Sequence, residues 1–80
     1  MKKTTLADRI VYAMDKRDMT QADLARNSGL STSVIAQIVT GKTTDPRFDT
    51  VVMLAIGLGV SLDFLAGNEP YSFVKYGDMR

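Results

Sequence analysis

The segment between Gln21 and Thr40 constrains the fold of this chain more than any other. It contains two short helical patterns separated by the residues Asn27-Ser28-Gly29-Leu30. Gly29 suits the left-handed conformation that ends a helix, and Ala25 is small enough to lie where two helices cross closely. A short turn that contains glycine and joins two helices predicts a helix-turn-helix. Its apolar contacts are expected from Leu24, Leu30, Ile35 and Ile38.

Apolar periodicity and capping residues place three further helices around this motif. We predict helices at about 5–17, 21–28, 32–40, 47–58 and 62–66. Thr20 with Asp23 is a capping-box pattern, and Ser31 and Ser61 are expected N-caps. The chain is therefore predicted to be all-α, with a five-helix domain over residues 1–68. The side chains expected to face inward include Ile10, Met14, Val34, Leu54 and Leu62.

Residues 69–80 form a tail whose sequence pattern differs from that of the predicted helices. Pro70 excludes a continuing helix, and Tyr71-Ser72-Phe73-Val74 has strand-like composition. Three of the six aromatic residues lie in this tail, and such apolar surface is seldom left exposed. We expect the tail to be a dimer contact or a site for another protein partner. The expected dimer contacts are Phe64, Tyr71 and Phe73; the alternative is a tail folded onto its own first or last helix.

The composition excludes several classes of function. Eighty residues are enough for one domain. With no Cys, no His and a single Glu, the chain lacks disulfides and the usual catalytic and metal-binding side chains, so we expect no enzyme, cofactor or metal site. No apolar run is long enough to span a bilayer, and the basic start leads into no apolar signal segment. We therefore expect a cytoplasmic protein without a membrane partner.

The charges are distributed unevenly along the chain. Residues 1–47 hold eight Lys and Arg against five Asp, and residues 48–80 hold two against four acidic residues. The first part therefore carries a net charge of +3 and the second −2. A basic half beside an acidic half points to a polyanionic partner on one side, and ordinary surface scatter is the alternative.

At several places the sequence resembles a known family, the Cro/lambda-repressor-type helix-turn-helix proteins, or XRE family. Thr20-Gln21-Ala22-Asp23-Leu24-Ala25 is similar to the opening of the family's second helix. Gly41-Lys42-Thr43 and Pro46-Arg47-Phe48 resemble the loop and the next helix start of small lambdoid phage repressors. Leu54-Ala55 and Leu58-Gly59-Val60-Ser61-Leu62-Asp63 resemble the last two helices. The resemblance runs from Leu6 to Asn68 and implies a five-helix, lambda-repressor-like DNA-binding domain that acts as a dimer.

The sequence also departs from the family pattern. Ser28 stands where an apolar residue is usual, and no pair of adjacent Gln residues opens the second motif helix. The operator sequence of a family member therefore cannot be transferred to this chain.

The resemblance and the place of each residue in the motif assign the DNA contacts. Base contacts are expected from Thr32, Ser33 and Gln37. Contacts to the DNA backbone are expected from Gln21, Ser31, Thr40, Lys42, Thr43, Thr44 and Arg47. The alternatives are that the hydroxyls only cap a helix and that the basic loop is only solvated.

The charged residues around the motif carry expectations of their own. Asp45 is expected to cap the fourth helix or to pair with Arg47. The Lys and Arg residues of the first two helices are expected to be solvated, and Arg9 and Arg26 are the best further candidates for phosphate contact among them.

Three functions fit the sequence. The first is a phage- or prophage-type transcriptional repressor that binds a pseudo-palindromic operator on double-stranded DNA as a homodimer. The second is an antitoxin or restriction-controller protein of the same fold. The third is a protein-interaction domain that does not bind DNA, which the small net charge of +1 allows but the placement of Gln21, Gln37, Lys42 and Arg47 disfavours.

Overall fold

The computed structural model describes residues 5–68, which form five α-helices and no strand. The helices are α1 (Leu6–Lys16), α2 (Gln21–Ser28), α3 (Thr32–Val39), α4 (Phe48–Leu58) and α5 (Leu62–Ala66). Their bounds lie within one residue of those predicted, and the all-α architecture is confirmed. The strand-like tail with Tyr71 and Phe73 lies outside the described residues.

Local side-chain caps explain where four of the helices, α1, α2, α3 and α5, begin. The Thr5 hydroxyl accepts a hydrogen bond from the Asp8 N–H (3.1 Å), and the Asp8 carboxylate accepts one from the Thr5 N–H (3.0 Å) at the start of α1. The Ser61 hydroxyl accepts from the Phe64 N–H (3.0 Å) at the start of α5. The capping box predicted at Thr20 begins α2. These bonds satisfy backbone donors that a helix leaves unpaired in its first turn.

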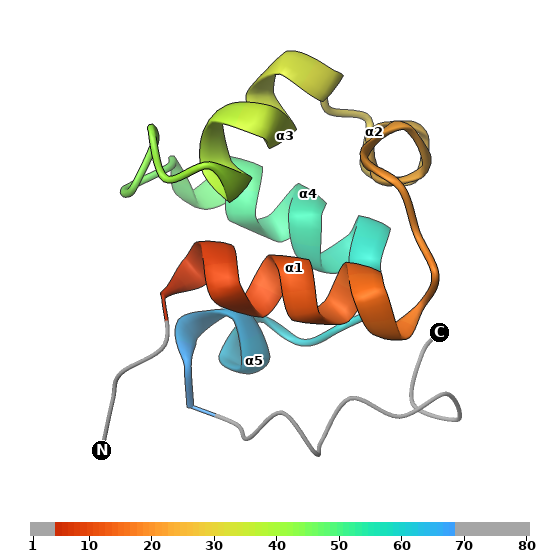
Figure 1. Cartoon of the computed structure of the whole chain (residues 1–80). Helices are drawn as coiled ribbons and strands as arrows, with labels where there is room; N and C mark the ends of the chain where they lie inside the picture. Colours follow the sequence, from red (N-terminus) through yellow and green to blue (C-terminus); the bar gives the residue numbers. More distant parts are fainter. Residues whose placement is uncertain (1–4, 69–80) are drawn as a thin grey trace.

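Helix α1 packs against α3, α4 and α5 (Figure 1). Helix α3 lies at one end of the molecule and α5 at the other, with α1 and α4 between them (Figure 1). Helix α2 packs on both α3 and α4, and most strongly on α4. The largest fully buried side chains are Ile10, Leu24, Ile35, Ile38, Leu54, Leu58 and Phe64.

Two side chains predicted to be buried are partly exposed instead. Val34 keeps 37% and Leu62 keeps 38% of its surface accessible to solvent. Successive residues of a helix lie about 100° apart, so Val34 stands at the edge of the buried line through Ile35 and Ile38. Leu62 lies about 200° around α5 from the buried Phe64.

The closest approach between helices described here joins α2 to α4. A Cβ atom added to Gly57 would lie 2.7 Å from the Cβ and 2.9 Å from the Cα of Ser28. Both residues are buried. Ala25, which we expected at a close helix crossing, is only half-buried against the core. A long apolar residue in place of Ser28 would prevent this contact, which explains the departure from the family pattern at this position.

Two arginines, Arg9 in α1 and Arg17 directly after it, bind the ends of other helices. The Arg9 Nη1 donates to the Phe64 carbonyl (3.3 Å), and its guanidinium lies 5.0 Å from the centre of the Phe64 ring. Arg17 donates from Nε to the Leu58 carbonyl (2.7 Å) and from Nη2 to the Gly59 carbonyl (2.9 Å). These carbonyls lie at the C-terminal ends of α5 and α4, where the helix dipole is negative.

This arrangement corrects two of the sequence-based expectations. Arg9 is only 7% exposed, so its predicted contact with DNA phosphate is wrong. Arg17 is half-buried and binds carbonyl groups, so it is not a merely solvated charge. Both side chains were misjudged because their partners are 55 and 41 residues away along the chain.

The contact between α2 and α4 leads to a first prediction, for the substitution Gly57→Ala. In an open helix position this change stabilises a protein by up to about 1 kcal/mol, because alanine is the better helix former. Here the added methyl group overlaps the Ser28 backbone, and overpacking costs about 1–3 kcal/mol. We expect a net loss of about 1 kcal/mol in urea-unfolding free energy. Ile56→Ala, at the neighbouring exposed position, should change stability little; a more stable Gly57→Ala variant would contradict the packing argument.

Candidate nucleic-acid interface

The α2–turn–α3 unit is held by short-range hydrogen bonds. Gly29 has φ = 83°, a left-handed conformation, and its N–H donates to the Ala25 carbonyl (2.9 Å). The Ser28 hydroxyl accepts from the Leu30 N–H (3.1 Å) inside the turn. The Ser31 hydroxyl accepts from the Val34 N–H (3.2 Å) and begins α3, so the predicted cap is confirmed. The turn therefore fixes the direction in which α3 leaves α2.

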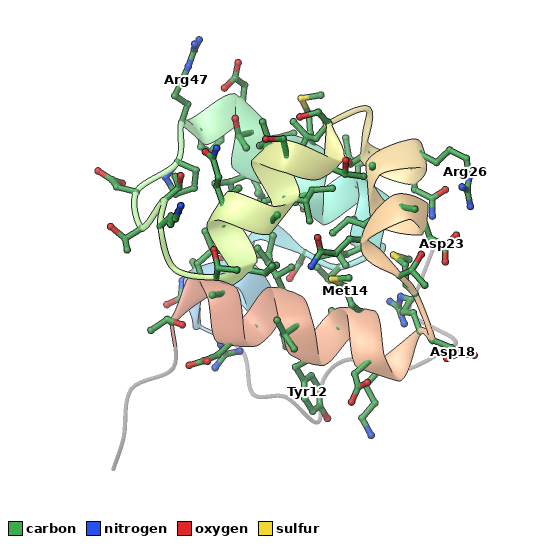
Figure 2. The ribbon with its side chains drawn as sticks, turned by 45° about the horizontal axis from the view of Figure 1, so that its top comes forward. Tyr12, Met14, Asp18, Asp23, Arg26 and Arg47 are labelled. Carbon is green, nitrogen blue, oxygen red and sulfur yellow. The ribbon has the colours of Figure 1, made fainter. Side chains whose placement is uncertain are left out.

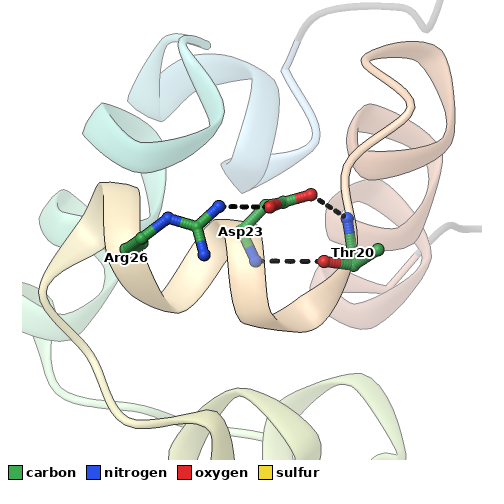
Figure 3. A network of polar contacts seen from close by, with 3 residues as sticks. All are labelled: Thr20, Asp23 and Arg26. Carbon is green, nitrogen blue, oxygen red and sulfur yellow. Dashed lines mark hydrogen bonds and ion pairs between the residues drawn. The ribbon is translucent and has the colours of Figure 1, made fainter.

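The start of α2 carries a polar network (Figure 3). Thr20 and Asp23 form a capping box, with bonds of 3.0 and 3.1 Å between each side chain and the other's N–H. Asp23 also forms an ion pair with Arg26. The hydrogen bond from the Thr20 backbone, then that from the Thr20 hydroxyl and that from Arg26, lower the pKa of Asp23 below its ordinary 3.8. Arg26, a further candidate for phosphate contact, therefore has an acidic partner next to it.

The exposed side of α3 carries the residues predicted to read bases. Thr32, Ser33 and Gln37 are all exposed, while Ile35 and Ile38 face the core. The Thr40 hydroxyl donates to the Ala36 carbonyl (2.7 Å) at the end of the helix. Helix α3 thus presents hydroxyl and amide groups outward on a rigid support, which is what recognition of base edges in the major groove requires.

The loop after α3 is tied back to the helix. The Thr43 N–H donates to the Gln37 carbonyl (2.9 Å), and the Gly41 N–H donates to the Ile38 carbonyl (3.1 Å). Lys42, Thr44 and Arg47 are exposed, and Thr43 is half-buried. The loop thus holds two cations beside the exposed side of α3, as phosphate contacts would require.

The prediction for Asp45 is wrong in both of its forms. Arg47 itself occupies the N-cap position of α4, and no side chain caps that helix. The partner of Arg47 is Asp49, at 3.6 Å, and the two side chains are 86% and 68% exposed. Figure 2 shows Arg47 extending away from the body of the molecule, on the opposite side from Asp23 and Arg26. A pair this exposed is weak, so Arg47 stays accessible to an external anion.

The prediction that Phe64 contacts a second subunit is wrong. Phe64 is fully buried in the core and carries Arg9 over its ring, so it has no surface to offer. The sequence analysis missed an exposed aromatic residue within residues 5–68: Phe48, at the start of α4, keeps 73% of its surface accessible. The position of Phe48 directly after the polar loop could have indicated this exposure, because a residue in the first turn of a helix need not face the core.

Phe48 borders an apolar hollow of about 470 Å³. The hollow lies between the start of α4, helix α5 and the loop before α4. Thr44 and Asp45 line it with polar side chains, and its apolar lining is Leu6, Pro46, Phe48, Val51, Leu62, Leu65 and Ala66. Exposed apolar surface of this kind marks an interaction site in many soluble proteins.

Nowhere in residues 5–68 do three or more His, Cys, Asp or Glu side chains come together to hold a metal ion. None of the helices in this part of the chain is long and apolar enough to cross a membrane.

Comparison with known proteins agrees with this geometry. A sequence model of a helix-turn-helix family matches residues 10–65. The protein P2 of Acyrthosiphon pisum secondary endosymbiont phage 1 is 40% identical over 45 residues, which are 56% of this chain and 48% of the phage protein. The chain thus spans about half the length of that relative. No solved structure matches.

The lowered pKa of Asp23 leads to a second prediction. Because the folded pKa lies below the unfolded value of about 3.9, the carboxylate stabilises the fold above about pH 4. That contribution should be lost as the pH falls through the folded pKa. Wild type should therefore exceed Asp23→Asn in unfolding free energy at pH 6, and the difference should shrink toward pH 2.

Arg26→Gln is the control for this prediction. This substitution removes the ion pair but keeps both hydrogen bonds between Asp23 and Thr20. The bond from the Thr20 backbone is the largest cause of the lowered Asp23 pKa, so Arg26→Gln should change the pH profile less than Asp23→Asn does. Thermal melts from pH 2 to 7 test this order. Equal profiles for wild type and Asp23→Asn would show that the capping box does not depend on the charge.

Proposed function

The chain belongs to the XRE-type helix-turn-helix family, a family of DNA-binding regulators, and we propose that it is a phage- or prophage-type repressor that binds a pseudo-palindromic operator as a dimer. The main support is the exposed polar row on α3, with Ser33 and Gln37 outward and Ile35 and Ile38 buried. The phage origin of the P2 protein supports the phage type.

In this proposal the residues of the interface divide into two roles. Base edges are read by Thr32, Ser33 and Gln37, whose side chains can donate and accept hydrogen bonds. The DNA backbone is bound on both sides of α3, with the start of α2 on one side and the loop after α3 on the other. The backbone contacts are Gln21, Ser31, Thr40, Lys42, Thr43, Thr44 and Arg47.

These roles give a third prediction, which two substitutions separate. Gln37→Ala should relax the preference at particular base pairs by about 1–3 kcal/mol for each lost bidentate contact. Lys42→Ala should weaken binding to all sequences and make the salt dependence shallower by about one unit of slope per subunit.

Lys16→Ala is the matched control for Lys42→Ala, because Lys16 is equally charged and exposed but lies on α1, away from the interface. The measurements are selection of binding sites from random duplex DNA, followed by titrations at several salt concentrations. A uniform loss of affinity in Gln37→Ala would contradict its role as a base reader. If wild type selects no sequence at all, the repressor function itself is wrong.

The proposed dimer forms through the apolar hollow beside Phe48, with a second copy of the chain as its occupant. Phe48 is exposed next to Arg47 and the loop proposed to contact DNA, so two copies joined here would hold their two loops near one another. A two-fold pair bound to a pseudo-palindrome has its half-sites about 34–36 Å apart, one turn of DNA.

The fourth prediction tests this surface with Phe48→Ser. Removing the exposed aromatic group should shift the dimer toward monomer by a factor of ten or more, on the order of 1.5–3 kcal/mol. Its thermal stability should hardly change, because Phe48 contributes little to the protomer core. Sedimentation equilibrium and footprinting measure the loss of the dimer, and thermal melts measure the stability.

Ile56→Ser is the control, because Ile56 is 70% exposed on the same helix but does not line the hollow. A chain that ends at residue 68 tests the separate expectation that Tyr71 and Phe73 contribute to the dimer. Unchanged dimerisation in Phe48→Ser would exclude the hollow, and unchanged dimerisation in the shortened chain would exclude the tail.

A further inference from the structure

Val34 is an apolar residue exposed on α3. It lies in the first turn of the helix, directly after Ser33 and three residues before Gln37. More than a third of its surface (37%) is accessible, although its helix neighbour Ile35 is fully buried. No apolar hollow described here includes Val34, so its exposed surface is not part of the Phe48 surface.

The position of this side chain is well defined. The Val34 N–H is held by the Ser31 hydroxyl at 3.2 Å, which fixes the first turn of α3. A valine in a helix adopts one side-chain rotamer in about 90% of cases, so its two methyl groups point in one direction. The structure therefore presents a preorganised apolar group beside the hydroxyl of Ser33 and the amide of Gln37.

The major groove contains one apolar group that can match such a side chain. Among the four base pairs, only those with thymine present a methyl group there, at C5. The N-terminal residues of a recognition helix lie closest to the base edges. An exposed valine in that turn loses its contact with water when the helix enters the groove, and a methyl group is its favourable neighbour.

We propose that Val34 determines specificity by contacting a thymine methyl group in each half-site, next to the base pair that Gln37 contacts. This inference rests on the proposed DNA binding and adds a chemical requirement to it. The half-site must contain a thymine whose methyl group, and not only its hydrogen-bonding pattern, contributes to affinity.

The experiment uses a duplex that the full-length chain selects from random DNA. Each thymine in one half-site is replaced in turn by deoxyuridine, which pairs identically but lacks the methyl group. Wild type should lose about fourfold in affinity at one thymine, the value of one buried methyl group. The variant Val34→Ala should bind the parent duplex more weakly and should show no further loss at that thymine.

Val11→Ala is the matched control, because Val11 is 49% exposed on α1 and is not one of the residues proposed to contact DNA. It should keep the wild-type sensitivity to deoxyuridine. Thermal melts confirm that each variant is folded before titration. The proposal for Val34 is overturned if Val34→Ala keeps the full sensitivity at every thymine while both proteins still bind the duplex. Failure of wild type to select any duplex would instead overturn the proposed DNA binding.

Discussion

The contact between Ser28 and Gly57 is the constraint on which the geometry of the interface depends. It brings the end of α2 onto α4 so closely that a single methyl group at position 57 would overlap the Ser28 backbone. Helix α3 follows α2 after only three residues, so a shift of α2 on α4 would move α3 as well. Arg17 adds a further contact to this packing, because its hydrogen bonds to two carbonyl groups fix the C-terminal end of α4 to the end of α1. The exposed side of α3 is thus positioned by contacts on the opposite side of the motif.

Local signals in the sequence were sufficient to predict the bounds of the helices and most residues of the candidate interface. The capping box at Thr20 and the glycine at position 29 act over four residues or fewer, so they can be recognised without the fold. The outward side of α3 follows from helical periodicity once Ile35 and Ile38 are assigned to the core. For the same reason the roles proposed for Ser33 and Gln37 needed no structure.

Two of the errors concern partners that are distant along the chain. Arg9 was misjudged because its partner Phe64 is 55 residues away, and Phe64 was misjudged because Arg9 covers it within the same protomer. Val34 lies at the edge of the buried side of α3, where periodicity alone cannot decide between core and surface.

The charges around the interface explain why base contacts must carry much of the proposed selectivity. Lys42 and Arg47 are exposed beside α3, but Asp49 lies 3.6 Å from Arg47 and the whole chain carries only +1. Each phosphate contact adds affinity without sequence information, and few such contacts mean weak non-specific binding. In the proposed function, a single protomer would therefore bind any DNA loosely. Two protomers joined at the Phe48 hollow would bind the second half-site at high effective concentration, so occupancy of the operator would rise steeply with protein concentration.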